Sequence, residues 1–413
     1  MAAIMTMLVA TSASVTAPNG TTIGIRLMTA VSSQQPAGKP VQAVVTVPVK
    51  VNGVIAIPVG AKLSGKTADV KAAPTSATSG NANDSTATLR LVFDKIQPPG
   101  GREQSLSAQL SSIDNARESV GSDGLITGIV ASETWEGRLN QGISKLENNH
   151  PGLAGLLGQA RDAFVKNVDA SISYPAGVDM EIKLTKDLTC HPPSNMTTIP
   201  EIAALNQLTA LVDAQPDRTV AGNPPRPSDL TNLVFIGSQQ EIDAAFKAAG
   251  WFAAAERDQA STMETARAII EDRGYQEAPV SVLLLDGHPP DLVFEKQTNT
   301  FAMRHHIRIW KRPVTFDGKE LWVAAATHDT GIDFSQESHT FTHKIDGNID
   351  HERAKVTSDL TFSGYVSAAS IVPRSNVPPD ISNATGDKLI TDGKMSALEF
   401  RSQPVSPSTI SGK

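Results

Sequence analysis

The fold of the C-terminal half is decided by "DLVFEKQTNTFAMRHHIRIWKRPVTFDGKELWVAAATHDTG", residues 291–331. Its runs rich in Val, Ile, Phe and Trp have the length and composition of β-strands. Asp317-Gly318 separates two of these runs, and Asp-Gly is typical of the tight turn of a β-hairpin. The stretch therefore predicts an antiparallel sheet whose strands follow one another along the chain.

Helices are predicted on both sides of this stretch. "NLVFIGSQQEIDAAFKAAG" (232–250) has a short apolar strand, a capping serine at Ser238 and apolar residues spaced as one helix face. Residues 261–274 repeat the pattern with a serine cap, and 346–360 predict a last helix. Residues 232–374 are thus predicted to form an α+β domain with an antiparallel sheet.

The first third of the sequence predicts β structure. "QAVVTVPVKVNGVIAIPVGAKLSGKTADV" (42–70) contains Asn52-Gly53 between two Val/Ile runs, a strong signal for a hairpin. "TATLRLVFDKI" (86–96) alternates as a half-buried strand does.

A weak internal repeat suggests how this β module closes. "GTTIGIRLMTAVS" (20–32) and "GVDMEIKLTKDLT" (177–189) share a pattern, and two such strands predict that the last strand returns beside the first. Between them, residues 150–169 have the apolar spacing of one helix. Residues 19–190 are therefore predicted to form an all-β barrel or sandwich with one helix, which makes the chain multidomain.

Three further segments lie outside these two domains. Residues 1–18 are apolar, of signal-peptide length but without a basic start, and are either a leader remnant or a first strand. The Pro-rich residues 191–231 are predicted to be a linker. Residues 375–413 are predicted to form a polar tail.

Composition narrows the class of function. The chain has 413 residues, a formal net charge of -7 and a pI near 5.7, which argues against binding to nucleic acid because phosphates require a basic surface. No stretch approaches the roughly 20 apolar residues of a transmembrane helix. The one cysteine, Cys190, excludes an intramolecular disulfide.

Five segments carry a family resemblance. They are "GWFAAAERDQAST", "APVSVLLLDGHPPDLVFEK", "RHHIRIWKRP", "LWVAAATHDTGI" and "THKIDGNIDHERAKVTSDL". In this order, over about residues 230–373, they resemble the LssY-type C-terminal domain of bacterial proteins. The resemblance implies an architecture but no activity, because the family has none established. Some members join the domain to a membrane phosphatase of the phosphatidic-acid-phosphatase type, and this sequence lacks that part.

A second resemblance lies in the β module. "IPVGAKLSG" (57–65) is similar to a strand-turn-strand of the TrbI-like β domains in the core channel proteins of type IV secretion systems. The resemblance implies an envelope β module. We therefore expect a periplasmic, envelope-associated or extracellular protein, with a cytoplasmic location as the alternative.

Six of the nine histidines lie between His305 and His351, which makes this region the candidate site. Strand alternation places Arg304, His306 and Arg308 on one face, and guanidinium groups with an imidazole suit a phosphate or carboxylate. A solvated or ion-paired face is the alternative. His305 falls on the opposite, apolar face, where a core histidine is expected.

The same region suggests a metal site. His339 and His343 have helical ligand spacing, but on a strand their rings would stand about 13 Å apart at ~3.3 Å per residue. A divalent ion, Zn or Mn, would therefore need ligands from neighbouring strands, and the set we predict is His306, His328 and His343.

Acid–base chemistry would draw on nearby residues. His328 and Asp329 end a strand just before a glycine turn, where functional sites are common. Asp350 lies in the first turn of the last predicted helix, where it suits the helix dipole or, alternatively, a general base. His328, Asp329 and Asp350 are the candidate catalytic residues.

Two functional hypotheses follow. The first is a bacterial envelope-associated or secreted binding or accessory protein, with an envelope protein or an anionic ligand as its partner. The second is a metal-assisted hydrolase of phosphoesters or similar anionic substrates that uses the His/Asp/Arg cluster at 304–353. Composition and the lack of a complete catalytic motif favour the first, and the density of the cluster favours the second.

Overall fold

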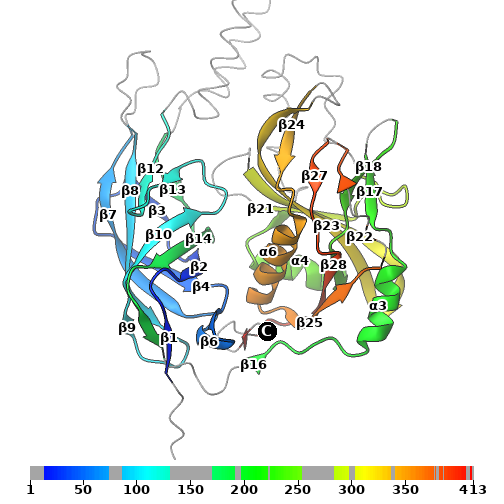
Figure 1. Cartoon of the computed structure of the whole chain (residues 1–413), viewed down its shortest axis with the longest axis horizontal. Coiled ribbons are helices and arrows are strands. Elements are labelled where there is room, and N and C mark those ends of the chain that lie inside the picture. The colour runs from blue at the N-terminus through cyan, green and yellow to red at the C-terminus, as the bar shows by residue number, and fades with distance from the viewer. Residues whose placement is uncertain are drawn as a thin grey trace, which may run out of the picture.

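The computed structural model describes residues 14–73, 86–130, 170–190, 197–221, 224–253, 283–296, 303–335, 340–375, 377, 381–384, 386–405 and 410–411. They form an all-β body and a body of mixed helices and strands, which lie next to each other (Figure 1). The chain is thus multidomain, with a β-barrel-like module followed by an α+β domain, as the sequence predicts. No helix in these ranges is long and apolar enough to cross a membrane.

The N-terminal domain is built around a nearly closed, barrel-like sheet. Its strand order is β10-β14-β2-β4-β7-β8-β12-β11, with β9 pairing β8. The bounds are β2 (Thr22–Leu27), β4 (Pro40–Val45), β7 (Lys62–Lys71), β8 (Thr88–Gln97), β9 (Gln104–Ser105), β10 (Ala108–Ile113), β11 (Ser119–Val120), β12 (Leu125–Thr127) and β14 (Asp179–Leu184).

Three small ribbons complete this domain. They pair β1 (Val15–Ala17) with β15 (Leu188–Cys190), β3 (Val31–Ser32) with β13 (Ser173–Tyr174), and β5 (Val49–Val51) with β6 (Val54–Ile57). Strand β1 lies at the end of the segment 1–18, of which the structure describes residues from 14 onward.

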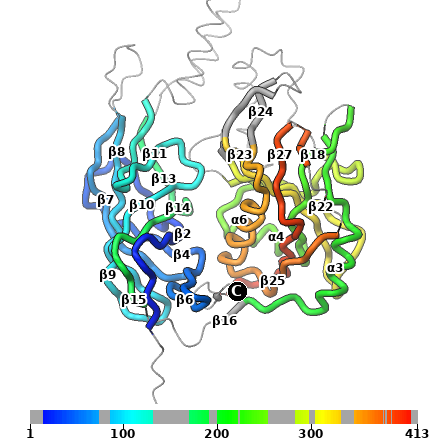
Figure 2. The backbone as a smooth tube through the Cα atoms, viewed as in Figure 1, coloured from blue at the N-terminus to red at the C-terminus, as the bar shows by residue number. Residues whose placement is uncertain are grey.

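The prediction of a turn and the prediction from the internal repeat are both confirmed in this domain. Asn52 and Gly53 have φ of 50° and 79° and join β5 to β6, as a tight hairpin turn requires. Strand β14 returns to pair with β2, with Ile182 opposite Ile23. Figure 2 shows β14 and β15 beside the blue strands at the start of the chain.

The C-terminal domain has one large sheet. Its order is β20-β21-β22-β23-β19-β28-β25, with β24 pairing β23, and within the described part of this sheet only the β19–β28 pair is parallel. The bounds are β19 (Leu233–Ile236), β20 (Phe252–Ala253), β21 (Leu292–Lys296), β22 (Met303–Phe316), β23 (Lys319–Ser335), β24 (Thr340–Ile345), β25 (Val366–Pro373) and β28 (Lys394–Phe400). Asp317-Gly318 turns β22 into β23, as predicted.

Helices cover both faces of this sheet. Helices α4 (Gln239–Ala248) and α6 (Ile349–Phe362) pack on one face, and α3 (Leu205–Asp213) packs on the other. Ser238 caps α4 in a capping box with Glu241, at the serine that the sequence indicates. Asn348 caps α6, where the sequence leaves the helix start open between Asp346 and Asn348. The α4–α6 face is turned toward the barrel (Figure 1), so α6 lies where the two domains meet.

Two short ribbons and one parallel pair lie outside the large sheets. The pairs are β17 (Arg218–Ala221) with β18 (Arg226–Leu230), β26 (Ile381–Ser382) with β27 (Lys388–Leu389), and β16 (Thr197–Thr198) with β29 (Ile410–Ser411).

Parts of the expected linker and tail belong to the folded C-terminal domain. Helix α3 lies within residues 191–231 and buries Leu208 and Val212 against the sheet. Strand β28 lies within the expected polar tail, yet it is an interior strand between β19 and β25. Its run "KMSALEF" is apolar on both faces because both faces are covered, so the run lacks the simple alternation of an exposed strand.

The helices predicted at 150–169 and 261–274 fall outside the described residues.

One close approach in the barrel gives a test of its packing. Gly65 lies at an irregularity in the β7–β8 pairing, where a Cβ atom would stand 1.9 Å from the carbonyl oxygen of Val92. We expect Gly65→Ala to lower the free energy of unfolding by about 3 kcal/mol, because backbone would have to move. Urea unfolding followed by circular dichroism measures this loss.

The matched control is Gly24→Ala on strand β2 of the same sheet, where the nearest atom to a Cβ would be 3.6 Å away. We expect this change to alter stability by less than about 1 kcal/mol. Equal effects of the two substitutions would contradict the packing described for β7 and β8.

Candidate functional site

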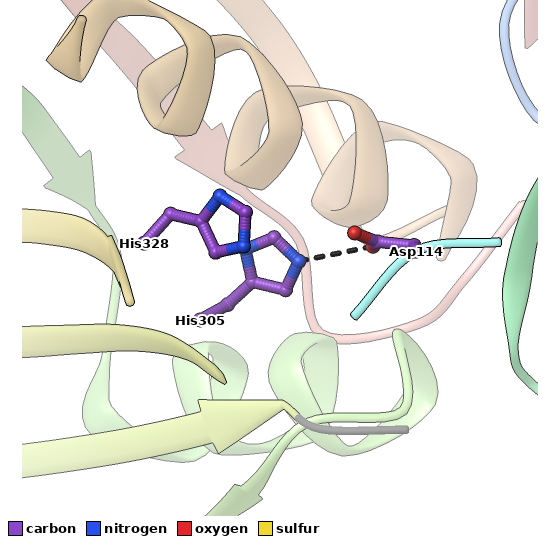
Figure 3. A group of neighbouring side chains, drawn as sticks. All are labelled: Asp114, His305 and His328. Atoms are coloured by element: carbon purple, nitrogen blue, oxygen red, sulfur yellow. Dashed lines mark hydrogen bonds and ion pairs between the residues drawn. The ribbon is translucent and has the colours of Figure 1, made fainter. Parts of the chain in front are cut away.

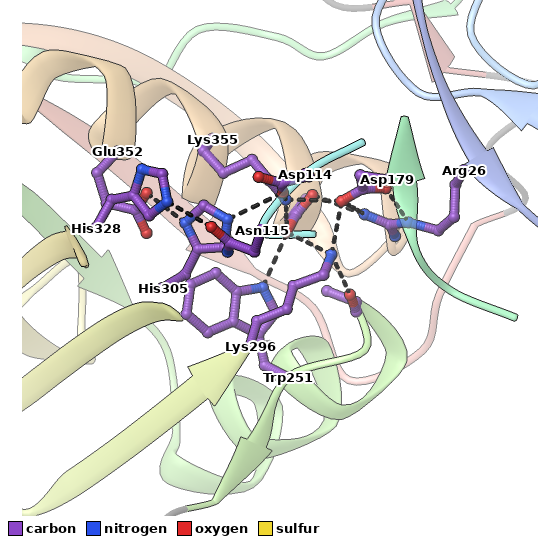
Figure 4. Close-up of polar contacts among 12 residues, drawn as sticks. Arg26, Asp114, Asn115, Asp179, Trp251, Lys296, His305, His328, Glu352 and Lys355 are labelled. Carbon is purple, nitrogen blue, oxygen red and sulfur yellow. Dashed lines mark hydrogen bonds and ion pairs between the residues drawn. The ribbon is translucent and has the colours of Figure 1, made fainter. Parts of the chain in front are cut away.

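A row of three cationic or titratable side chains crosses the large sheet. Lys296 on β21 is opposite His305 on β22, and His305 is opposite His328 on β23. Directly opposed residues lie on the same face of a sheet, so all three lie on the face that α6 covers. The turn after β10 of the N-terminal domain, Asp114-Asn115, reaches the same place (Figure 4).

His305 lies at the centre of this row. Its side chain is 4% exposed, with Nδ1 2.7 Å from Glu352 Oε2 and Nε2 2.9 Å from Asp114 Oδ2. Burial opposes the charged form, but the charges of Glu352 and Asp114 outweigh it and raise the pKa of His305 to about 10. In the structure as described, His305 is therefore a cation that donates to one carboxylate from each domain.

His328 stacks on His305, with ring centroids 4.5 Å apart and an angle of 24° between the rings (Figure 3). Its Nε2 lies 2.6 Å from Asn115 Oδ1. Burial and the positive charge of His305 both lower the pKa of His328. His328 is thus the neutral partner of a stacked pair in which His305 carries the charge.

Asp114 keeps its negative charge at this junction. Burial would raise the pKa of Asp114, but the charges of His305 and Lys355 outweigh burial and lower it to about 2. Lys355 Nζ lies 3.9 Å from Asp114 Oδ2.

A buried ion-pair network continues from this point along α6 (Figure 4). Arg26 of β2 bonds both oxygens of Asp179, at 2.7 and 3.0 Å, and also reaches Asp359 Oδ1 at 2.7 Å. Lys296 and Lys355 each lie 2.7 to 2.9 Å from both Asp179 Oδ2 and Asp359 Oδ2. Two aspartates, one from each domain, are thus shared by three cations.

Trp251 completes the environment of Asp359, because its indole Nε1 donates to Asp359 Oδ2 at 3.0 Å. Burial would raise the pKa of Asp359, but the charges of Lys296, Lys355 and Arg26 hold it well below its usual range. The same kind of balance holds the pKa of Asp179 below its usual range.

The whole junction is balanced in charge. Four cations face four anions: Arg26, Lys296, His305 and Lys355 against Asp114, Asp179, Glu352 and Asp359. Buried charges are tolerated when they are paired and hydrogen bonded, and removing one partner leaves another charge unpaired. The docking of the two domains therefore depends on these groups being present together.

The opposite face of the sheet holds the predicted cationic row. His306 Nε2 lies 2.7 Å from Asp329 Oδ2, and Arg304 lies 3.5 Å from Glu295 and 3.9 Å from Asp329. Burial would lower the pKa of His306, but Asp329 outweighs it and raises the value. These cations thus share one face, as predicted, and carboxylates of the same domain lie against them.

The same face contains an acid that the sequence did not single out. Asp229 of β18 is buried, 3.9 Å from Arg308, and burial raises its pKa, with a further contribution from the charge of Asp329.

Asp350 has structural partners at the start of α6. One of its oxygens accepts hydrogen bonds from Arg353 and from the Thr391 hydroxyl, both at 2.9 Å, and the other accepts from the Asp392 amide at 2.6 Å. It ties the first turn of α6 to the segment before β28.

The structure places two of the predicted metal ligands, His306 and His328, apart. His306 and His328 lie on opposite faces of the sheet, because His305, the neighbour of His306, is the residue opposite His328. His343 is opposite Ile332 in the β23–β24 pairing, and its side chain falls outside the described part. His328 and Asp329 also face opposite ways, since they are consecutive in β23.

The structure brings together a different set of possible metal ligands. Ligand atoms of Asp114, His305 and His328 lie within 4.8 Å of one another. Sequence reasoning placed His305 correctly on the apolar face but gave no reason to connect it with Asp114, which lies 191 residues earlier. No local signal links them, because the contact forms only when the domains dock.

Two hollows on the described surface lie elsewhere. The first has a volume of about 470 Å³ and is lined by residues of the segment from Arg374 to Gly393. The second has a volume of about 580 Å³, and its lining includes Pro200 and Ser402. None of the histidines of the cluster lines either hollow.

The network predicts a large effect of Asp359→Asn. We expect the free energy of unfolding to fall by about 3–5 kcal/mol, because Lys296, Lys355 and Arg26 lose a shared buried anion. Urea unfolding followed by tryptophan fluorescence measures the change, since Trp251 contacts Asp359. Glu320→Gln, which breaks an exposed pair with Lys311, is the control and should change stability by at most about 1 kcal/mol.

The depressed pKa values of Asp359 and Asp179 set the sign of the pH dependence. A carboxylate with a lowered folded-state pKa stabilises fully above its unfolded value, near 4, and loses this effect as pH falls further. The stability difference between the wild type and Asp359→Asn should therefore be constant from pH 7 to 5 and shrink below about pH 4. A difference that grows on acidification would contradict the assignment of charges.

Comparison with solved structures identifies a similarity to ComB10 of the Com type IV secretion system of Helicobacter pylori. The two chains are 14% identical, the match covers 43% of this chain and 93% of that chain, and the TM-score is 0.23. A score this low supports no argument about fold or function. No curated protein matches the sequence.

The family comparison concerns the second domain. Residues 213–395 match the model of a family described as LssY C-terminus. The match begins at the end of α3 and includes α4, α6 and the strands that carry His305 and His328. The C-terminal part of this chain is therefore an LssY-type C-terminal domain.

Proposed function

We propose that this protein is a binding or accessory protein of the bacterial envelope, without catalysis of its own. Its LssY-type domain is held rigidly against the β module, and the pair presents one joint surface to an envelope protein or an anionic ligand. Nucleic acid is not among the partners, since the net charge is -7.

The observation that carries this proposal is the state of the candidate catalytic groups. His306 and Asp329 bond each other, Asp350 bonds Arg353 and the Asp392 amide, and His328 stacks on His305 beside Asn115. A hydrolytic site needs such groups next to space for a substrate. Here they are mostly buried and bonded to protein, which is the arrangement of a structural core.

Two features support the envelope setting. The segment 57–65, with its TrbI-like pattern, has the expected strand-turn-strand geometry, in which Gly60 has φ 81° between β6 and β7. Some LssY-type domains are also joined to a membrane phosphatase in the same chain, as the resemblance implies.

Turnover assays test the absence of catalysis. Purified protein is incubated with p-nitrophenyl phosphate and with bis(p-nitrophenyl) phosphate, with Zn²⁺ or Mn²⁺ added. We expect the wild type and Asp329→Asn to release product at the same background rate. Saturable turnover that Asp329→Asn abolishes would overturn the proposal.

Fractionation of the producing bacterium tests the setting separately. We expect the protein in the envelope fraction or in the medium. Recovery with the cytoplasmic marker enzymes would contradict the envelope assignment. It would not bear on catalysis, which the turnover assays test.

One observation favours the hydrolase as the second candidate. Asp229, with its raised pKa, lies in the same buried group as His306, Arg308 and Asp329, and such perturbed acids are frequent in active sites. In that case Asp229→Asn and Asp329→Asn would both abolish turnover of an anionic substrate.

A further inference from the structure

We propose that Asp114, His305 and His328 bind one divalent ion of the zinc class, and that the ion links the two domains. This site lies on the opposite face of the sheet from His306 and is independent of whether the protein is an enzyme.

The donor atoms are near enough for one ion. The carboxylate of Asp114 and one nitrogen of each ring lie within 4.8 Å of one another, and small side-chain movements would place them at about 2.0–2.2 Å from a common centre. Two imidazoles with one carboxylate suit Zn²⁺, whereas Mg²⁺ and Ca²⁺ prefer oxygen ligands alone. Cys190 is not part of this group. It lies in the core of the barrel, where it is 1% exposed.

Glu352 orients one ligand in the manner of known metal sites. Its Oε2 accepts the Nδ1 proton of His305 at 2.7 Å, which directs Nε2 toward Asp114. A metal-bound histidine usually donates its other ring N–H to such a carboxylate, which fixes the tautomer and the ring orientation. The hydrogen bond that holds His305 now would therefore remain when the ion binds.

A second observation concerns the other oxygen of Glu352. Oε1 is buried and has no hydrogen-bond partner in the described part of the chain, although a buried carboxylate oxygen normally has one. A water on the fourth position of the ion would supply a donor. The junction thus contains an acceptor that the protein groups around it leave unused.

The exchange releases one proton for each ion bound. The ion takes the place of the proton on His305 Nε2, which passes to solvent, and His305 binds as a neutral imidazole, so the charge of the junction rises by one. Asp114 and Glu352 supply the negative charge, and Lys355 stays paired with Asp179 and Asp359.

The ligands come from both domains. Asp114 follows β10 in the barrel, whereas both histidines lie on the large sheet of the LssY-type domain. An ion at this position stabilises only the docked arrangement, because undocking removes one of three ligands. It is therefore a structural link, and binding should stabilise the folded chain by an amount that grows with the logarithm of the free ion concentration.

Metal binding is tested on the full, untagged chain. The protein is stripped with a chelator, dialysed, loaded with Zn²⁺ and passed through gel filtration, and bound metal is measured by plasma mass spectrometry. We expect about one zinc per chain in the wild type, with a higher melting temperature than the stripped protein. Less than a tenth of an equivalent in the wild type would overturn the proposal without any variant.

Variants then locate the ion. His328→Ala and Asp114→Ala should lose the zinc and the thermal shift, and Glu352→Gln should weaken binding about 10–100-fold. His351→Ala is the matched control, since His351 is a histidine of the same region that is 70% exposed, and it should keep the zinc. Retention in Asp114→Ala, or loss in His351→Ala, would show that the ion binds elsewhere.

Folding of each variant is checked by circular dichroism. Substitution with Co²⁺ adds a measurement of the ligands themselves, which loss of stability alone does not change. Visible absorption bands typical of nitrogen and oxygen ligands should be present in the wild type and in His306→Ala. Loss of these bands in His306→Ala, with retention in Asp114→Ala, would place the ion on the opposite face and overturn the assignment.

Discussion

The interaction on which the docked structure depends is the sharing of Asp359 by Arg26, Lys296 and Lys355. Arg26 comes from the barrel, and the other three groups come from the LssY-type domain. A buried carboxylate with three cations around it keeps its charge, and each cation in turn needs that carboxylate. Because Arg26 and Asp359 are 333 residues apart, this contact fixes how the first and last parts of the chain meet.

Helix α6 organises the junction. Glu352, Lys355 and Asp359 follow one another at spacings of three and four residues, so they lie on one helix face. That face meets the sheet row of Lys296, His305 and His328 on one side and the barrel turn at Asp114 on the other. The Asn348 cap and the hydrogen bond from Arg353 to Asp350 hold the helix start in place, which sets the positions of these groups. The chemistry-bearing residues therefore gather at a domain boundary, where they hold the protein together.

Local features of the sequence were predictable because their causes are local. Asn-Gly and Asp-Gly set the two hairpins through positive φ, and Ser238 sets the start of α4. Strand β28 and helix α3 were assigned to polar or linker segments, because a short run among Pro, Gly and Ser gives a weak signal. Their place in the fold follows from burial against the sheet, which depends on residues far away in the chain.

The sequence by itself assigned Arg304, His306 and Arg308 to one face of β22 and His305 to the other, because strand alternation is a property of the backbone. It did not determine that His328 of β23 shares the face of His305, because this depends on the register between the two strands. Only the tertiary structure decided that His305 and His328 meet Asp114 and Asn115, at separations of 191 and 213 residues. These contacts depend on the docking of two separately folded domains, and such docking leaves no spacing pattern in either segment.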